Sequence, residues 1–213
     1  MLIEPPSDCA SCPRLSSFRA HWQVEEPAWH NKPVRSFGSL DANMLIVGLA
    51  PGLRGANATG RPFTGDGAGD ALYPLLLELG MAIGTYGGHA ADGLELVNLR
   101  ITNAVRCVPP ENKPTAAETS NCRTFLIQEI NAMPNLRVIL ALGKLAHDNI
   151  LKSLGMRVGD AKFAHGATHL VAPYLVQDSY HCSRYNMNTN RLTTHMFRSV
   201  LAQARDLSRG DAS

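Results

Sequence analysis

The sequence predicts an α/β fold: a single three-layer domain over residues 1–213, with a central four-stranded parallel sheet and helices on both faces. Three observations support this prediction. Short apolar runs, typical of strands buried on both faces, alternate with longer segments of helical spacing. Loops rich in glycine, proline and polar residues follow the runs. Because crossovers between parallel strands are right-handed, these loops are expected to meet at one edge of the sheet.

The first strand is predicted at residues 44–47, and it leads into a polar loop that continues to Asp66. Long loops inside compact domains are usually functional, and ligands of α/β sheets bind outside the carboxyl ends of the strands. Leucines at helical spacing then predict a helix over residues 69–79, which Gly80 ends.

The remaining elements repeat this order along the chain. A second strand region covers residues 96–105, with Asn103 near its carboxyl end, and a proline-rich loop follows at 109–114. Thr115 and Glu118 form a capping box that begins a helix running to about residue 131. The later predicted elements are a strand at 138–142, a helix at 144–154, a strand at 170–174, a polar loop at 179–191 and a helix at 193–207.

Composition narrows the functional classes. The chain has a hydrophobic fraction of 45% and a mean hydropathy of -0.10, without an apolar run of membrane-spanning length or a signal-peptide layout. We therefore expect a cytoplasmic monomer with no membrane partner. The net charge of +2 permits a nucleic-acid partner without requiring one. Residues 1–40, rich in proline and polar groups, are predicted to form an N-terminal arm of the same domain.

Four of the five cysteines form two groups, Cys9-x-x-Cys12 near the start and Cys107 with Cys122 around the second loop. In a cytoplasmic protein such cysteines are more often metal ligands or catalytic groups than disulfides. Four thiolates suit either a zinc ion or a [4Fe-4S] cluster, and the spacing does not distinguish them. Four unrelated buried cysteines are the structural alternative. Cys182 stands apart from both groups.

Three loop sequences, taken together, resemble a known family. They are Gly-Leu-Ala-Pro-Gly (48–52) with Thr-Gly-Arg-Pro-Phe-Thr-Gly-Asp (59–66), Asn-Ala-Val-Arg-Cys-Val-Pro-Pro-Glu-Asn-Lys-Pro-Thr (103–115), and Ser-Tyr-His-x-Ser-Arg-x-Asn (179–186). With the four cysteines, they resemble the uracil-DNA glycosylase superfamily, and within it the fifth, B-type branch, whose members bind a [4Fe-4S] cluster. The resemblance extends from Cys9 to the C-terminal helix.

The resemblance implies a monofunctional DNA-repair enzyme. Such an enzyme flips uracil, and in this branch often other deaminated bases such as hypoxanthine and xanthine, out of DNA and hydrolyses the N-glycosidic bond. It also implies that Cys9, Cys12, Cys107 and Cys122 hold a [4Fe-4S] cluster with a structural role, which would tie the N-terminal arm to the rest of the domain.

Candidate roles follow for the groups of the first and second loops. Phe63 is expected to stack on the flipped base, with a place in the core as the alternative. Asn103 is expected to read the base edge, with a strand-end cap as the alternative. Gly48, Ala50 and Gly52 complete the predicted base-binding set.

The predicted catalytic residues are Asp66, Asn112 and His181. His181 would donate a hydrogen bond to the base carbonyl as negative charge grows on the leaving base. The Asp66 carboxylate would stabilise the oxocarbenium-like sugar, with Asp70 as a competitor and an N-cap as its alternative or additional role. Asn112 would position the attacking water, with an ordinary turn asparagine as the alternative.

The predicted DNA contacts lie on the same three loops, and Tyr185 or Arg184 is expected to wedge into the duplex. They are Arg61, Lys113, Ser183, Arg184, Tyr185 and Asn186. The chain departs from the family pattern at three positions. Leu49 stands where many members carry an acidic residue, Ala58 where branch members tend to have arginine, and Cys182 where many relatives have proline or an aliphatic residue.

Two other functions are alternatives to this one. A zinc-dependent hydrolase or nucleobase deaminase is not supported, because no His-x-Glu precedes a Pro-Cys-x-x-Cys. A non-catalytic protein that binds damaged DNA in the same pocket remains an alternative that only an assay of turnover separates from an enzyme.

Overall fold

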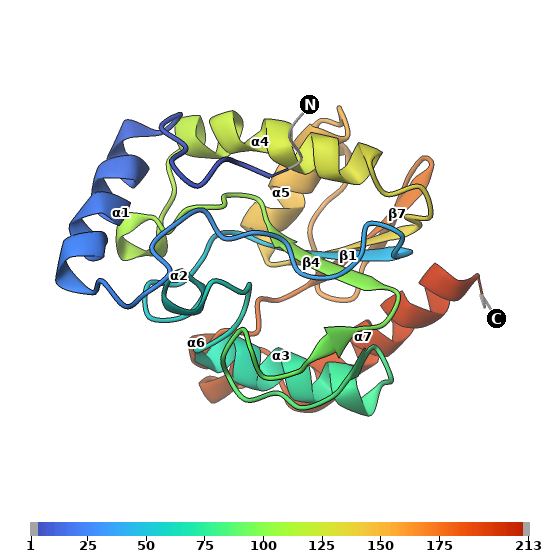
Figure 1. Ribbon diagram of the computed structural model, residues 1–213. Coiled ribbons are helices and arrows are strands. Elements are labelled where there is room, and N and C mark those ends of the chain that lie inside the picture. Colours follow the sequence, from blue (N-terminus) through green and yellow to red (C-terminus); the bar gives the residue numbers. More distant parts are fainter. Residues whose placement is uncertain (1–3, 211–213) are drawn as a thin grey trace.

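The computed structural model describes residues 4–210, and its centre is a five-stranded sheet in the order β4-β1-β5-β7-β6 (Figure 1). The first four strands of that order are parallel to one another, and β6 is antiparallel to β7. The strands are β1 (Met44–Gly48), β4 (Leu99–Asn103), β5 (Val138–Leu142), β6 (Thr168–Val171) and β7 (Tyr174–Ser179). The predicted α/β class with a parallel centre is confirmed.

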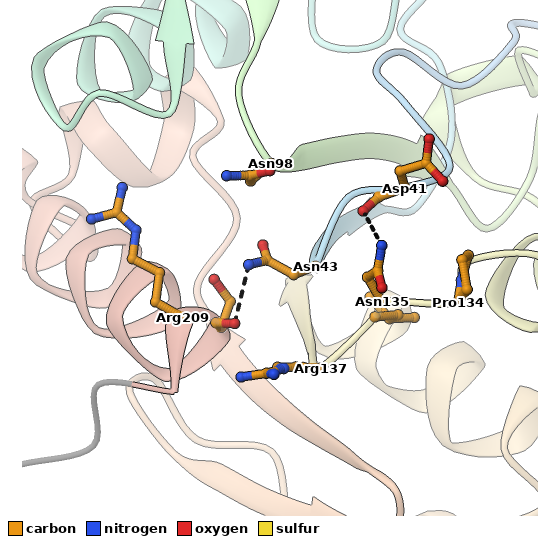
Figure 2. Close-up of a pocket in the computed structure, with 9 residues that line it drawn as sticks. Asp41, Asn43, Asn98, Pro134, Asn135, Arg137 and Arg209 are labelled. Carbon is orange, nitrogen blue, oxygen red and sulfur yellow. Dashed lines mark hydrogen bonds between the residues drawn. The ribbon is translucent and has the colours of Figure 1, made fainter.

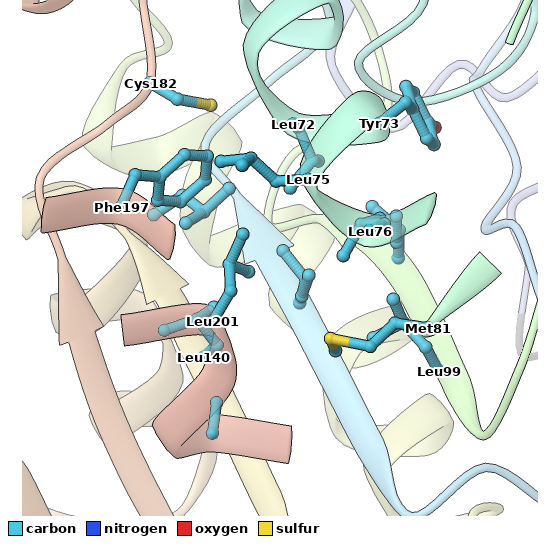
Figure 3. Close-up of a cluster of buried hydrophobic side chains, with 14 of the residues drawn as sticks. Leu72, Tyr73, Leu75, Leu76, Met81, Leu99, Leu140, Cys182, Phe197 and Leu201 are labelled. Atoms are coloured by element: carbon cyan, nitrogen blue, oxygen red, sulfur yellow. The ribbon is translucent and has the colours of Figure 1, made fainter. Parts of the chain in front are cut away.

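Helices cover both faces of the sheet (Figure 1). The helices are α1 (Pro13–Glu25), α2 (Ala56–Thr59), α3 (Gly67–Glu78), α4 (Ala116–Asn131), α5 (Lys144–Ser153), α6 (Arg184–Asn188) and α7 (Thr194–Arg209). Along β1, Ile46 packs in one cluster with residues of α3 and α7, and Val47 packs in another with residues of α4 and α5. Figure 3 shows part of the first cluster, in which Leu72 and Leu75 of α3 lie beside Phe197 of α7.

Strand register places the functional loops at one edge. Gly48 at the end of β1 pairs with Asn103 at the end of β4, and Leu142 of β5 pairs with Ser179 of β7. The chain leaves β1 for β4 on one side and later enters β5 on the other side. Such a reversal of strand order opens a crevice outside the carboxyl ends, where ligands of α/β sheets bind.

The strand predicted at residues 170–174 is wrong, and it accounts for four predicted strands against the five observed. Those residues span a hairpin, in which β6 ends at Val171, β7 begins at Tyr174, and Ala172 and Pro173 form the turn. The C-terminal part of β7 was not predicted as a strand. Its residues Gln177, Asp178 and Ser179 are buried but polar, and a run of polar residues is typical of a loop.

The N-terminal arm contains a helix, α1, that the sequence pattern did not predict. Only Leu15 and Arg19 of this helix are buried, so there is no apolar stripe to detect. Polar contacts fasten the arm to the body: Glu4 pairs with Arg100 and Arg106, and Arg14 of α1 pairs with Glu118 of α4.

The segment predicted as a glycine-rich insertion at 84–93 joins the two short strands β2 (Ala82–Ile83) and β3 (Glu95–Leu96), which pair with each other. The loop predicted at 179–191 contains the short helix α6. Within residues 4–210, no helix combines the length and the apolar character that a membrane crossing requires.

Candidate active site

A cavity of about 680 Å³ opens at the carboxyl edge of the sheet. Its wall is formed by the loops that follow β1, β4 and β7. The predicted residues that line it are Ala50, Gly52, Phe63, Asp66, Asn103, Asn112, His181, Ser183 and Arg184. The fold therefore brings together, in one cavity, side chains that lie as much as 134 positions apart, between Ala50 and Arg184.

Phe63 lies in the cavity wall and also in the core. Its ring is 6% exposed and belongs to the cluster packed beneath α3 and α7. A Cβ atom on Gly48 would lie 2.5 Å from Cζ of Phe63 and 2.4 Å from Oδ1 of Asn103. Gly48 thus supports the cavity from behind, because only a residue without a side chain admits both groups at the strand end.

Asp66 is the N-cap of a helix and also lines the cavity, as its two predicted roles require. Oδ1 accepts hydrogen bonds from the backbone N–H groups of Ala68 (3.1 Å) and Gly69 (3.2 Å), which makes Asp66 the N-cap of α3. Oδ2 faces the first loop, where Cβ atoms on Gly52 and Gly55 would approach it to 2.9 Å and 2.4 Å. The cap therefore aims the other carboxylate oxygen at the cavity wall.

His181 follows β7, and its ring centroid lies 6.0 Å from that of Phe63, with 31° between the ring planes. Desolvation lowers the pKa of His181, against the opposing effect of the Asp66 charge. The imidazole is therefore neutral at pH 7 and carries one N–H donor. Nδ2 of Asn186 donates to the His181 carbonyl oxygen over 2.8 Å. Asn186, predicted as a DNA contact, uses this amide to hold the His181 backbone in place.

The second loop presents Asn112 to the cavity with a left-handed backbone, φ 57°, directly after Glu111 with φ 55°. Both lie in the short 3-10 helix Pro110–Asn112. Next to them, the Lys113 side chain is 80% exposed and forms a 3.3 Å ion pair with Glu111. Lys113 therefore remains available to a ligand that approaches the rim.

The structure does not support the predicted DNA contact of Arg61. Arg61 is 4% exposed, and its guanidinium forms two hydrogen bonds to the Asp92 carboxylate, of 2.7 and 2.6 Å. The rings of Phe37 and Tyr73 surround it at 5.1 and 5.2 Å. A side chain committed to buried partners in this way cannot reach a phosphate on the surface.

Arg54 also lines the cavity, although the sequence indicated only that it is a basic residue of the loop. Arg184 also lines the cavity, and a Cβ on Gly67 would come within 3.2 Å of its Nε atom. The neighbouring Tyr185 points away from the protein and is 71% exposed. Ser183 caps α6 by accepting from the Asn186 backbone N–H.

A second pocket, of about 440 Å³, opens at the amino ends of the strands, at the opposite edge of the sheet (Figure 2). Asn43 and Asn98 precede β1 and β4 there, and Arg137 precedes β5. None of the predicted site residues lines this pocket, and the candidate site is the cavity at the carboxyl edge.

The four paired cysteines line one small cavity between α1, the second loop and α4. The Arg106 backbone N–H donates to Sγ of Cys122 over 3.4 Å, and Nδ2 of Asn121 donates to Sγ of Cys12 over 3.7 Å. Burial raises the pKa of Cys107 to about 12. Among residues 4–210, no three cysteine sulfur atoms lie within 4.8 Å of one another. The structure thus places the four paired cysteines around the same small cavity.

His147, His169 and Asp178 do bring their ligand atoms within 4.8 Å of one another. Nδ1 of His147 lies 2.6 Å from Oδ1 of Asp178, and Nε2 of His147 lies 3.0 Å from the Ala161 carbonyl oxygen. A carbonyl and an ionised carboxylate only accept, so these contacts favour the imidazolium, in which both ring nitrogens donate, and the pKa of His147 is raised. Because neither nitrogen has a free lone pair, we interpret the cluster as a buried ion pair. No signal in the sequence indicated it.

A model of the uracil-DNA glycosylase superfamily matches residues 35–205 of the chain. The protein belongs to this superfamily. It is 41% identical to the type-5 uracil-DNA glycosylase of Thermus thermophilus, over 97% of this chain and 96% of the relative. It is also 41% identical to the type-5 uracil-DNA glycosylase of Pyrobaculum aerophilum, over 92% and 88%. A type-4 uracil-DNA glycosylase of P. aerophilum is 35% identical over 59% of this chain and 58% of its own length.

These similarities confirm the predicted resemblance to the superfamily and to its fifth branch. Leu49, which stands where many superfamily members carry an acidic residue, lines the cavity here. Among the described residues that line the cavity, Asp66 is the one carboxylate. Asp66 is therefore the one described lining residue that could place a negative charge beside a bound substrate.

Proposed function

We propose that the protein is a monofunctional DNA glycosylase that excises uracil from DNA and leaves an abasic site. The observation that carries this proposal is the cavity, where an aromatic ring, a carboxylate, a neutral imidazole and an amide converge from three loops. The type-5 relatives support a hydrolase of this kind. By the same resemblance, we propose that hypoxanthine and xanthine are also accepted, and that the chain acts as a single-domain, cytoplasmic monomer.

Base recognition begins with extrusion of the nucleotide, since the glycosidic bond is inaccessible within the base stack. Stacking on Phe63 offsets part of that cost, because base–aromatic stacking contributes about 1 to 3 kcal/mol. The Asn103 amide both donates and accepts, as the edge of uracil requires. Gly48, Ala50 and Gly52 keep the backbone close to the base, with no large side chain in its place.

In the chemical step, the bond between C1′ and the base nitrogen breaks, and its electron pair stays on the base. His181 donates a hydrogen bond to the base carbonyl, where the negative charge grows, and Asp66 stabilises the positive charge that grows on the sugar. Asn112 positions the water whose oxygen bonds to C1′, while the proton released by this water neutralises the departing base. Both electrostatic contacts strengthen as the bond breaks, so they accelerate the reaction rather than merely binding substrate.

On the DNA-binding face, we propose that Arg54, Lys113 and Arg184 contact phosphates around the mouth of the cavity, because all three lie on the loops that form it. Ser183 lines the same side of the cavity and is proposed as a further contact. Tyr185 is the better candidate for the wedge, since its ring is exposed, whereas Arg184 lies against the cavity wall.

We further propose that Cys9, Cys12, Cys107 and Cys122 bind a [4Fe-4S] cluster. The resemblance to the fifth branch, rather than the cysteine spacing, favours this cluster over a zinc ion. The four cysteines line one small cavity, and the donors to Cys12 and Cys122 would stabilise thiolates. When bound, the cluster would supply a covalent link from the arm to α4.

An excision assay tests the proposed activity. A uracil-containing oligonucleotide should become an alkali-labile abasic strand, and this conversion should collapse in both Asp66→Ala and His181→Ala. If the protein binds the oligonucleotide but leaves every base attached, it is the damaged-DNA binder and not the enzyme. Full activity in Asp66→Ala would refute the proposed chemistry.

A further inference from the structure

Asp92 lies in the glycine-rich segment 84–93, and its carboxylate binds Arg61 of the first loop, 31 positions earlier in the chain. Nη1 and Nη2 of Arg61 donate to the two oxygens of Asp92 over 2.7 and 2.6 Å. The two side chains are 4% and 2% exposed. A buried, bidentate pair of this kind is strongly directional, because the planar guanidinium must face the carboxylate edge.

The Asp92 carboxylate is itself held in place. It accepts from the backbone N–H of Gly87 over 2.8 Å and from that of Leu94 over 3.0 Å. With the two bonds from Arg61, four donors surround one carboxylate, and together they keep the pKa of Asp92 well below its usual range. Segment 84–93 thus provides a fixed anion beside the first loop.

Aromatic rings hold the faces of the Arg61 guanidinium. The carbon Cζ of Arg61 lies 5.2 Å from the ring centroid of Tyr73 and 5.9 Å from that of Tyr86. These two rings stack on each other at 4.8 Å. Tyr86 belongs to the same segment as Asp92, so this segment fixes Arg61 both in the plane of its guanidinium and across its face.

The two chain neighbours of Phe63, Pro62 and Thr64, each accept a hydrogen bond from a side chain of this cluster. Nε of Arg61 donates to Oγ1 of Thr64 over 2.9 Å, and the Tyr73 hydroxyl donates to the Pro62 carbonyl oxygen over 2.5 Å. Phe63 itself has φ 53°, a left-handed conformation that a bulky side chain adopts only where its surroundings impose it. The contacts of Pro62 and Thr64 impose it here.

We propose that Asp92 is a positioning residue for base excision: through Arg61 it holds Phe63 in the conformation that presents the ring to the flipped base. This inference rests on the proposed role of Phe63 as the stacking group. It assigns a function to segment 84–93, which lies outside the three loops of the cavity. Asp92 need not touch DNA, because its effect is transmitted by the backbone of the first loop.

The test is Asp92→Asn, which preserves shape but removes the charge that orients Arg61. Single-turnover excision of uracil at saturating enzyme should slow about 10- to 100-fold, since small misplacements of a reacting group have effects of this size. Affinity for undamaged duplex should stay within about twofold, because no proposed phosphate contact is altered. Arg61→Lys should slow excision similarly, and the double variant should be no slower than the slower single variant.

A loss of stability alone would also slow an enzyme, so a matched control is needed. Ile150, a buried residue of α5 in the cluster on the opposite face of the sheet from Phe63, serves this purpose. Ile150→Val or Ile150→Ala, whichever lowers the melting temperature as much as Asp92→Asn, should leave the excision rate within about twofold of the wild type. If Asp92→Asn does not fold, Tyr86→Leu removes one ring from Arg61 and should slow excision in the same direction.

Two outcomes would overturn the inference: an unchanged excision rate in folded Asp92→Asn, or an equal loss in the Ile150 control. Phe63→Ala separates this inference from the proposed function. If Phe63→Ala slows excision and Asp92→Asn does not, only the positioning role fails. If Phe63→Ala has no effect, the proposed role of Phe63 fails first.

Discussion

A Cβ atom on Gly55 would lie 2.4 Å from Oδ2 of Asp66 and 2.9 Å from its Cγ atom. Protein Cβ atoms do not approach other atoms so closely. The absence of a side chain at Gly55 is therefore what allows the Asp66 carboxylate to occupy its place beside the cavity.

Gly55→Ala should displace Asp66 and lower the single-turnover excision rate about tenfold or more, because the carboxylate loses its alignment with the sugar. Gly159→Ala is the control, since a Cβ at Gly159 would meet no atom within 4 Å. The measurement is the excision rate of both variants on one uracil substrate. Wild-type activity in Gly55→Ala would show that the position of Asp66 is not critical.

The N-cap of Asp66 and its proposed catalytic role are separable by substitution. Asn is as good an N-cap as Asp, so Asp66→Asn should keep the stability of α3 while lowering excision about 100-fold through loss of the charge. Asp66→Ala should lose both, with a further destabilisation of about 1 kcal/mol from the missing cap. Chemical denaturation and excision assays on both variants check this, and equal activity of Asp66→Asn and the wild type would contradict it.

The buried pair of His147 and Asp178 makes stability depend on pH. Desolvation opposes the charge on His147, but hydrogen bonding and attraction to Asp178 prevail and raise its pKa above the usual value. The pair's contribution is therefore full below the unfolded pKa of about 6.5 and is lost as the pH rises through the folded pKa.

His147→Gln isolates this contribution. The difference in melting temperature between the wild type and His147→Gln should be largest near pH 6 and shrink toward about pH 9. Thermal melts across this range provide the measurement. A difference that grows with pH would mean that His147 is neutral in the folded protein.

The proposed cluster predicts a specific cysteine dependence. The purified protein should carry about four iron atoms per chain with equal sulfide, and it should be coloured. Cys107→Ser should lose iron and fall in melting temperature, because the link between arm and body is lost. Cys182→Ser, in which a buried thiol outside the group is changed, should retain its iron. Colourless, iron-free wild-type protein would refute the cluster.

The salt dependence of DNA affinity tests the proposed phosphate contacts. Each cation that neutralises one phosphate adds about 0.9 to the slope of log affinity against log salt for duplex DNA. Lys113→Ala and Arg54→Ala should each reduce this slope by about that amount. Arg157→Ala is the control, since Arg157 is exposed, pairs with Asp160 and does not line the cavity. An unchanged slope in Lys113→Ala would show that Lys113 does not contact a phosphate.

Local patterns predicted several elements of the fold well. The apolar run at 138–142 is β5, and the capping box of Thr115 and Glu118 begins α4 as expected. These predictions succeeded because burial of a short run and satisfaction of free helical N–H groups depend on neighbouring residues. The hairpin at β6 and β7 was missed because its polar residues are buried by distant partners, among them His147 for Asp178.

The sequence by itself determined the fold class, the family and the residue types of the cavity, because these depend on periodicity and on loop sequences that remain contiguous in the chain. Only the tertiary structure decided which polar groups face the cavity and which support it. Arg61 and Asn186 were both predicted to contact DNA, yet Arg61 pairs with Asp92 and Asn186 holds the His181 carbonyl. A charged or amide side chain satisfies its hydrogen bonds with whatever the fold places beside it, and chain-local patterns do not contain that neighbour.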